Sequence, residues 1–190
     1  MLPLVGLSLA AAASAQAGNS YPPTPIGVGP RFHLRPATPA IRAGRPVGAL
    51  RCGASTRRFG AHIELFAHNR VVIVPASIGV ATPFTRAGAF VRPGGCTYPL
   101  RTLQPTGVVQ VTAGRRLTLS DLFRVWGQPL SRTRLASFRT SARRPVRGYL
   151  GGRRWRGPLA AIPLRRHAQI VLELGRFIRP HRVFLFPAGL

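Results

Sequence analysis

His62, Glu64 and His68 occupy even positions along one predicted strand, a spacing that could bring metal ligands together. Side chains two apart on a strand share a face and lie about 6.6 Å apart, so His62 and Glu64 could contact one ion. Zinc sites usually need three or four protein ligands. A third would have to come from another histidine, namely His33, His167 or His181. The competing interpretation, which we favour, is that these are exposed polar residues on the solvent face of a hairpin.

Basic residues are densest between positions 143 and 166, where aromatic side chains are interspersed among them. Arginine combined with aromatic residues is the pattern that binds single-stranded nucleic acid or sugar-phosphate polymers, through ion pairs and stacking. The alternative is a solvated sheet face in an arginine-biased protein. The candidate polyanion site consists of Arg143, Arg144, Arg147, Arg153, Arg154, Trp155, Arg156, Arg165 and Arg166, with Tyr149 nearby.

The charge of the whole chain is also strongly positive. All 28 basic residues are arginine, only Glu64, Asp121 and Glu173 are acidic, and the net charge is +25. Either the partner is polyanionic or the composition reflects a GC-rich genome, and the absence of lysine favours the genomic bias. Under both interpretations we expect the protein to bind anionic polymers or surfaces, without specificity.

The sequence lacks the residue patterns of the common catalytic sites. Acid–base and glycosidase chemistry normally needs two facing carboxylates, and three in the whole chain almost exclude it. There is no Gly-x-Ser-x-Gly elbow, and Gly151-Gly152 is followed by a strand rather than the helix of a phosphate-binding loop. The sequence therefore predicts a non-enzymatic protein without a cofactor.

The N-terminus and the cysteines indicate export. An apolar run ending in Ala13-Ser14-Ala15 is typical of a signal peptide, so we expect one over residues 1–17, with cleavage after Ala15 or Ala17. No other segment is apolar and long enough to span a membrane. Cys52 and Cys96 are the only cysteines, and an even number in an exported chain predicts a disulfide. The predicted location is the cell envelope or the exterior.

Periodicity predicts the elements that position these residues. Prolines dominate residues 18–47, which we expect to be a flexible linker before a single β-rich domain over 48–190. Within that domain we expect a hairpin over 61–74, a loop over 81–96, and strands at 108–111, 146–150 and 170–174. Gly151-Gly152 predicts a tight turn into a return strand, and the end of the chain predicts an extended segment packed on the body.

One helix is predicted. Leu119, Leu122, Phe123 and Trp126 form an apolar face, which leaves Arg124 outside. Thr118 and Asp121 can form a capping box, and Gly127 can end the helix. The predicted fold class is therefore α+β, mainly β, with hairpins, one short helix and one disulfide, in a β-grasp-like arrangement.

Several phrases of the sequence resemble an uncharacterised family of small exported bacterial proteins, over roughly residues 50 to 190. They are His62 to Phe66, Val74 to Val80, Cys96 to Leu100, Leu119 to Leu130, Ala161 to Leu164 and Phe186 to Leu190. The family has no assigned activity. The resemblance implies a histidine cluster in relatives, but here Gly60, Arg101, Leu103 and Gln104 occupy those positions, so that only His62 remains. A Gly-Asp-Pro turn of the relatives is shortened here to Gly157-Pro158.

Three functional hypotheses follow from the sequence. The first is an exported, non-enzymatic envelope or secreted interaction module. The second is a polyanion-binding protein that uses its arginines. The third is a metal-binding protein built around His62 and Glu64.

Overall fold

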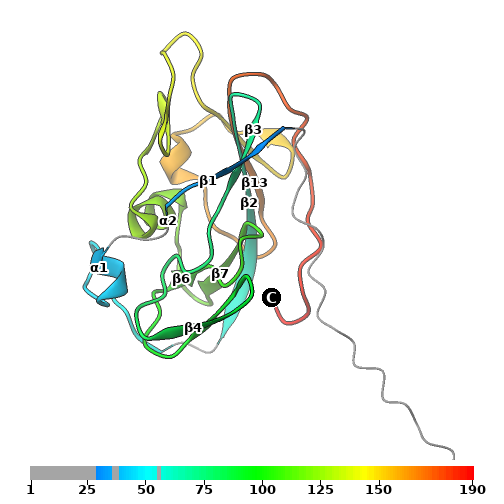
Figure 1. Cartoon of the computed structure of the whole chain (residues 1–190). Coiled ribbons are helices and arrows are strands. Elements are labelled where there is room, and N and C mark those ends of the chain that lie inside the picture. Colours follow the sequence, from blue (N-terminus) through cyan, green and yellow to red (C-terminus); the bar gives the residue numbers. More distant parts are fainter. Residues whose placement is uncertain (1–28, 36–38, 55–56) are drawn as a thin grey trace, which may run out of the picture.

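The computed structural model describes residues 29–35, 39–54 and 57–190. Its centre is an eight-stranded sheet of mixed direction (Figure 1). Six strands lie in the order β1-β3-β2-β13-β11-β12, while β7 pairs with β2 and β6 pairs with β7. The bounds are β1 Arg31–His33, β2 Arg58–Ala67, β3 Arg70–Ile73, β6 Leu100–Arg101, β7 Val108–Thr112, β11 Arg147–Leu150, β12 Arg153–Arg154 and β13 Gln169–Leu174.

The hairpin predicted over 61–74 is confirmed by β2 and β3, which pair antiparallel with Leu65 opposite Val72. His68 and Asn69 adopt φ values of 49° and 62°, as a tight two-residue connection requires. On its other edge β2 pairs in parallel with β13. This central position buries both faces of β2, which decides the environment of its polar side chains.

One face of the sheet packs on α2 (Leu119–Trp126). The helix begins and ends at the predicted residues, so the prediction is confirmed. Asp121 accepts a hydrogen bond from the Thr118 N–H at 2.9 Å, and Gly127 ends the helix at φ 75°. The four predicted apolar side chains are buried, each contributing about 1.5–3 kcal/mol through apolar burial. Arg124 stays exposed.

The remaining elements surround this sheet and helix. They are α1 Pro39–Arg42, the 3-10 helix η1 Leu159–Ala161, the hairpin of β4 Phe84–Ala87 and β5 Phe90–Pro93, and the small sheet of β8 Leu130–Ser131, β9 Arg134–Leu135 and β10 Phe138–Arg139. The prediction that residues 81–96 form a loop is thus wrong, since β4 and β5 lie within this range. Gly88, at φ 58°, makes the tight turn of a hairpin that buries Val91 completely.

The N-terminal predictions have a mixed outcome. Residues 1–28, which include the predicted signal peptide, lie outside the described residues. Within the expected linker, β1 pairs in parallel with β3, and Ile41 is completely buried in the core. The linker interpretation is therefore wrong for these described parts of 18–47, because Phe32 on β1 packs against the core and Ile41 on α1 lies within it.

The predicted disulfide is confirmed. Cys52 and Cys96 are bonded, with their Cα atoms 5.4 Å apart. The mainly β, α+β class is confirmed as well, whereas the β-grasp-like arrangement stays a prediction. None of the helices within the described residues has the length and apolar character needed to cross a membrane.

The second face of the sheet is covered by residues 176–190, which we call the C-terminal strap. In Figure 1 this orange-to-red segment runs along the side of the sheet away from α2. Ile178 packs in the apolar cluster that contains Phe66. Phe184 stacks on His62 with ring centroids 3.7 Å apart, and Phe186 covers Gly60. The strap therefore follows β2 in the reverse direction, and it confirms the extended packed segment predicted for the end of the chain.

Candidate functional site

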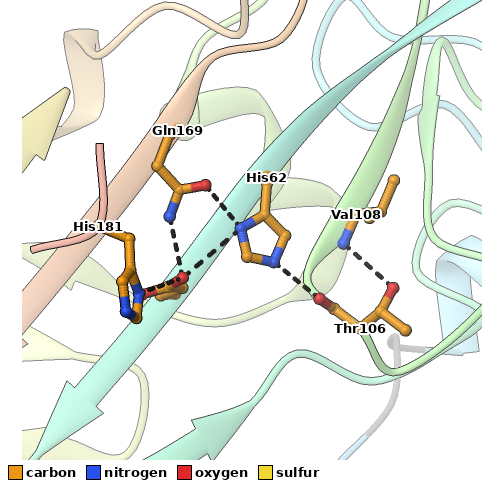
Figure 2. Close-up of polar contacts among 6 residues, drawn as sticks. His62, Thr106, Val108, Gln169 and His181 are labelled. Atoms are coloured by element: carbon orange, nitrogen blue, oxygen red, sulfur yellow. Dashed lines mark hydrogen bonds and ion pairs between the residues drawn. The ribbon is translucent and has the colours of Figure 1, made fainter. Parts of the chain in front are cut away.

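A buried polar network lies between the sheet and the strap (Figure 2). His62 and Glu64 come from the same face of β2, and Gln169 lies directly opposite His62 on β13. The Gln169 Nε2 donates to Glu64 Oε1 at 3.0 Å, and the strap adds His181, whose Nδ1 lies 2.9 Å from Glu64 Oε2. The network thus joins three elements and fastens the middle of the strap to the sheet.

The ring of His62 is completely buried, and both its nitrogens face oxygen atoms. Nδ1 lies 2.7 Å from Gln169 Oε1, and Nε2 lies 2.9 Å from the main-chain oxygen of Thr106. Burial lowers the pKa of His62, against the opposing effects of the Gln169 hydrogen bond and the nearby Glu64 charge. A neutral ring can donate to only one of these two oxygens.

The predicted metal ligands do not assemble into a metal site. His68 lies in the exposed turn after β2, so it does not share the face of His62 and Glu64. Among the described residues, no group of three His, Cys, Asp or Glu side chains could hold a metal ion. The physical reason is that both nitrogens of His62 are engaged by Gln169 and Thr106, which leaves Glu64 and His181 as two ligands where zinc needs three or four.

The solvent-face interpretation of this strand is also wrong. His62 is 0% exposed and Glu64 is 4% exposed, because the strap covers them. The alternation along β2 correctly identified which residues share a face. It carried no information about a segment more than 100 residues away that covers this face.

The candidate polyanion residues are divided among several places. Arg147 lies beside Glu173, with Nη2 3.3 Å from Oε2, and it also donates to the main-chain oxygen of Gly175. Tyr149 is buried, so its ring is closed to a ligand. The other predicted residues are exposed or partly exposed: Arg143, Arg144, Arg153, Arg154, Trp155, Arg156, Arg165 and Arg166.

Three of these residues line one groove of about 750 Å³, namely Arg154, Trp155 and Arg156. Arg132, which sequence reasoning missed, lines the same groove from the turn after β8, and an apolar floor comes from Leu130, Val146 and Leu159. The Trp155 indole is partly buried, and its Nε1 donates to the main-chain oxygen of Pro158 at 3.0 Å. We call this surface the Trp155 groove.

A second hollow of about 420 Å³ lies where the strap ends, and we call it the arginine pocket. Its arginines come from segments far apart in the sequence, and Gln110, Ala113, Gly189 and Leu190 complete its lining. Only Arg166 belongs to the predicted polyanion set. The arginines of the pocket are Arg57, Arg58, Arg101 and Arg166.

The chain matches no protein-family model, no curated protein and no solved structure. Each of the three side-chain carboxylates is already engaged: Glu64 with His181, Asp121 with Arg124 and the helix cap, and Glu173 with Arg147. Within the described residues, which include all 28 arginines, only Arg124 and Arg147 lie within 4.0 Å of a carboxylate, so the other 26 have none.

Proposed function

We propose that the protein is an exported, non-enzymatic binding module for an anionic polymer, and that the polymer binds along the Trp155 groove. The observation that carries this proposal is the lining of the groove, in which Arg132, Arg154 and Arg156 surround one partly exposed indole. None of the chain's carboxylates lines it. Guanidinium groups can pair with phosphate, sulfate or carboxylate groups, while the indole provides a stacking surface.

Export is supported by two features of different kinds. The Cys52–Cys96 bridge is typical of an oxidising compartment, and the N-terminal sequence has the apolar run and small residues of a signal peptide. An exported protein of net charge +25 meets acidic surface polymers outside the cytoplasm, whereas nucleic acid offers the same charge with bases that can stack. The shared chemistry is a repeating anionic chain.

The test measures binding of heparin and of single-stranded DNA at several salt concentrations. We expect the triple variant Arg132→Gln, Arg154→Gln and Arg156→Gln to weaken binding strongly. For DNA, the slope of log affinity against log salt should become shallower by about 2, since each lost contact accounts for about 0.7. The matched control replaces Arg143, Arg144 and Arg165, which are exposed and lie outside the groove.

Trp155 distinguishes the two polymers. The variant Trp155→Ala should weaken DNA binding by about 1–3 kcal/mol per stacked base, with Trp155→Phe retaining most of the affinity. Heparin has no bases, so its binding should depend mainly on the arginines. If the groove triple and the control triple weaken both polymers equally, the attraction is unselective and the proposal of a defined groove is wrong.

A further inference from the structure

Arg58 is a charged side chain in a buried position without an acidic partner. It comes from the start of β2 and is only 7% exposed. Its terminal nitrogens donate to the main-chain oxygen of Tyr98, both at 3.2 Å, and to Thr97 Oγ1 at 2.9 Å. Its Nε has no hydrogen-bond partner among the described residues. Neutral oxygens thus hold the guanidinium in place but leave its charge uncompensated.

A second arginine adds a like charge to the same pocket. Arg101 lies on β6, two strands away from Arg58, and its Nε donates to Gln110 Oε1 at 2.9 Å. Burial and then the charge of Arg101 lower the pKa of Arg58 to about 10, and burial lowers the pKa of Arg101. Two desolvated cations therefore repel each other, an arrangement that is costly unless an anion compensates for it.

The surroundings of this pair increase the positive charge. Arg57 and Arg166 line the same pocket from exposed positions, and the Arg166 guanidinium is held over the Phe59 ring, 5.7 Å from its centroid. Glu64, Asp121 and Glu173 pair elsewhere, and none of them lines the pocket. The fold thus gathers four guanidinium groups around a hollow, and none of them forms an ion pair with a carboxylate of the described residues.

We infer that the arginine pocket is a binding site for a phosphate- or sulfate-bearing small molecule, whose tetrahedral oxyanion group lies between Arg58 and Arg101. A doubly charged oxyanion matches two guanidinium groups in charge and accepts hydrogen bonds from both. The pocket volume of about 420 Å³ falls in the range of small-molecule sites, so the oxyanion is one end of a larger ligand.

The pocket and the Trp155 groove share no residue, so this inference does not rest on the proposed function. One wall of the pocket comes from Gly189 and Leu190, at the end of the strap. The ligand therefore contacts both the sheet and the strap, and its binding should hold the strap in place.

Isothermal titration with inorganic pyrophosphate, at constant ionic strength in chloride, tests the site. We expect one pyrophosphate per chain. Arg101→Gln should weaken binding by about tenfold to a hundredfold, the effect of losing a charge-assisted hydrogen bond. Arg144→Gln removes an exposed arginine outside both hollows, so it is the matched control and should change the affinity less than twofold.

Thermal unfolding provides a second measurement that a merely structural role for Arg101 would not reproduce. Without oxyanion, Arg101→Gln should melt at the same temperature as the wild type or higher, because it relieves like-charge repulsion. With pyrophosphate the wild type should become the more stable protein. Trp155→Ala should bind pyrophosphate normally, which separates this site from the polymer groove.

Two results would overturn the inference. One is binding of several pyrophosphates per chain that Arg101→Gln leaves unchanged. The other is an equal rise in melting temperature for wild type and Arg101→Gln upon addition of pyrophosphate. Either would mean that the oxyanion interacts with the general positive surface.

Discussion

Removal of the Cys52–Cys96 disulfide is expected to lower the free energy of unfolding by about 4 kcal/mol. The bridge joins residues 44 apart in the sequence. Closing such a loop removes about 13 cal/mol/K of entropy from the unfolded chain in the chain-entropy model, which gives this value at 25 °C. The folded structure should persist, because Gly53 and Thr97 exchange two main-chain hydrogen bonds beside the bridge, at 3.1 and 3.0 Å. The effect therefore acts mainly on the unfolded state.

The assay is urea unfolding of the double variant Cys52→Ala, Cys96→Ala, followed by tryptophan fluorescence, since Trp126 is buried. Wild-type protein unfolded under reducing conditions is the control, and both should lose a similar free energy. The dependence on urea should steepen, because an unfolded chain without the cross-link exposes more surface. A loss below about 1 kcal/mol in both proteins would refute the reasoning from loop entropy.

Three further changes test the strap, a buried carboxylate and the helix cap. Gly60→Ala would place a Cβ 2.6 Å from the Phe186 ring, so its free energy of unfolding in urea should be about 1–3 kcal/mol lower than that of the wild type. Gly53 has open space around it, so Gly53→Ala should change the free energy of unfolding by less than about 0.5 kcal/mol. Burial raises the pKa of Glu173 above its ordinary value of 4.5, so its stabilising contribution is complete below pH 4.5 and is lost as the pH rises through the folded-state pKa. Glu173→Gln should therefore gain stability relative to wild type between pH 4 and pH 7, and a constant difference would contradict this. Asp121→Ala removes the side chain that accepts from the N-cap and should cost about 0.5–2 kcal/mol, measured by the same urea titration.

Local signals in the sequence were sufficient to predict α2 and the hairpin of β2 and β3. The helix has its apolar spacing, a capping residue at Thr118 and a terminating Gly127 within ten residues, and all three agree. The hairpin likewise has alternating residues before Asn69, which tolerates positive φ, and a continuous apolar run after it. Elements whose determinants lie close together in the sequence can be predicted from it.

Elements that depend on distant partners could not be predicted in this way. β1 is three residues long and exists because it pairs with β3, about 40 residues further along the chain. The hairpin of β4 and β5 lies in a segment rich in glycine and proline, where Gly88 forms the turn between two strands. Glycine and proline indicated where chain direction changes, and the short strands between them had too few residues for a clear period.

The arginines show most clearly that positions in the sequence do not reveal which residues meet in the fold. Their positions in the fold determine where ligand binding should be tested. Residues 143–166 are dense in arginine along the chain, but the fold separates them. Strands β11 and β12 place Arg147 beside Glu173 and Arg154 in the Trp155 groove, and the turn before β13 places Arg166 in the arginine pocket. Conversely, Arg58 and Arg101 are 43 positions apart and meet because β2 pairs with β7 and β7 with β6. Density along the sequence measures how many charges a segment carries. The potential that a ligand meets depends instead on strand pairing and on where the three carboxylates lie, and both factors favour the pocket at the end of the strap.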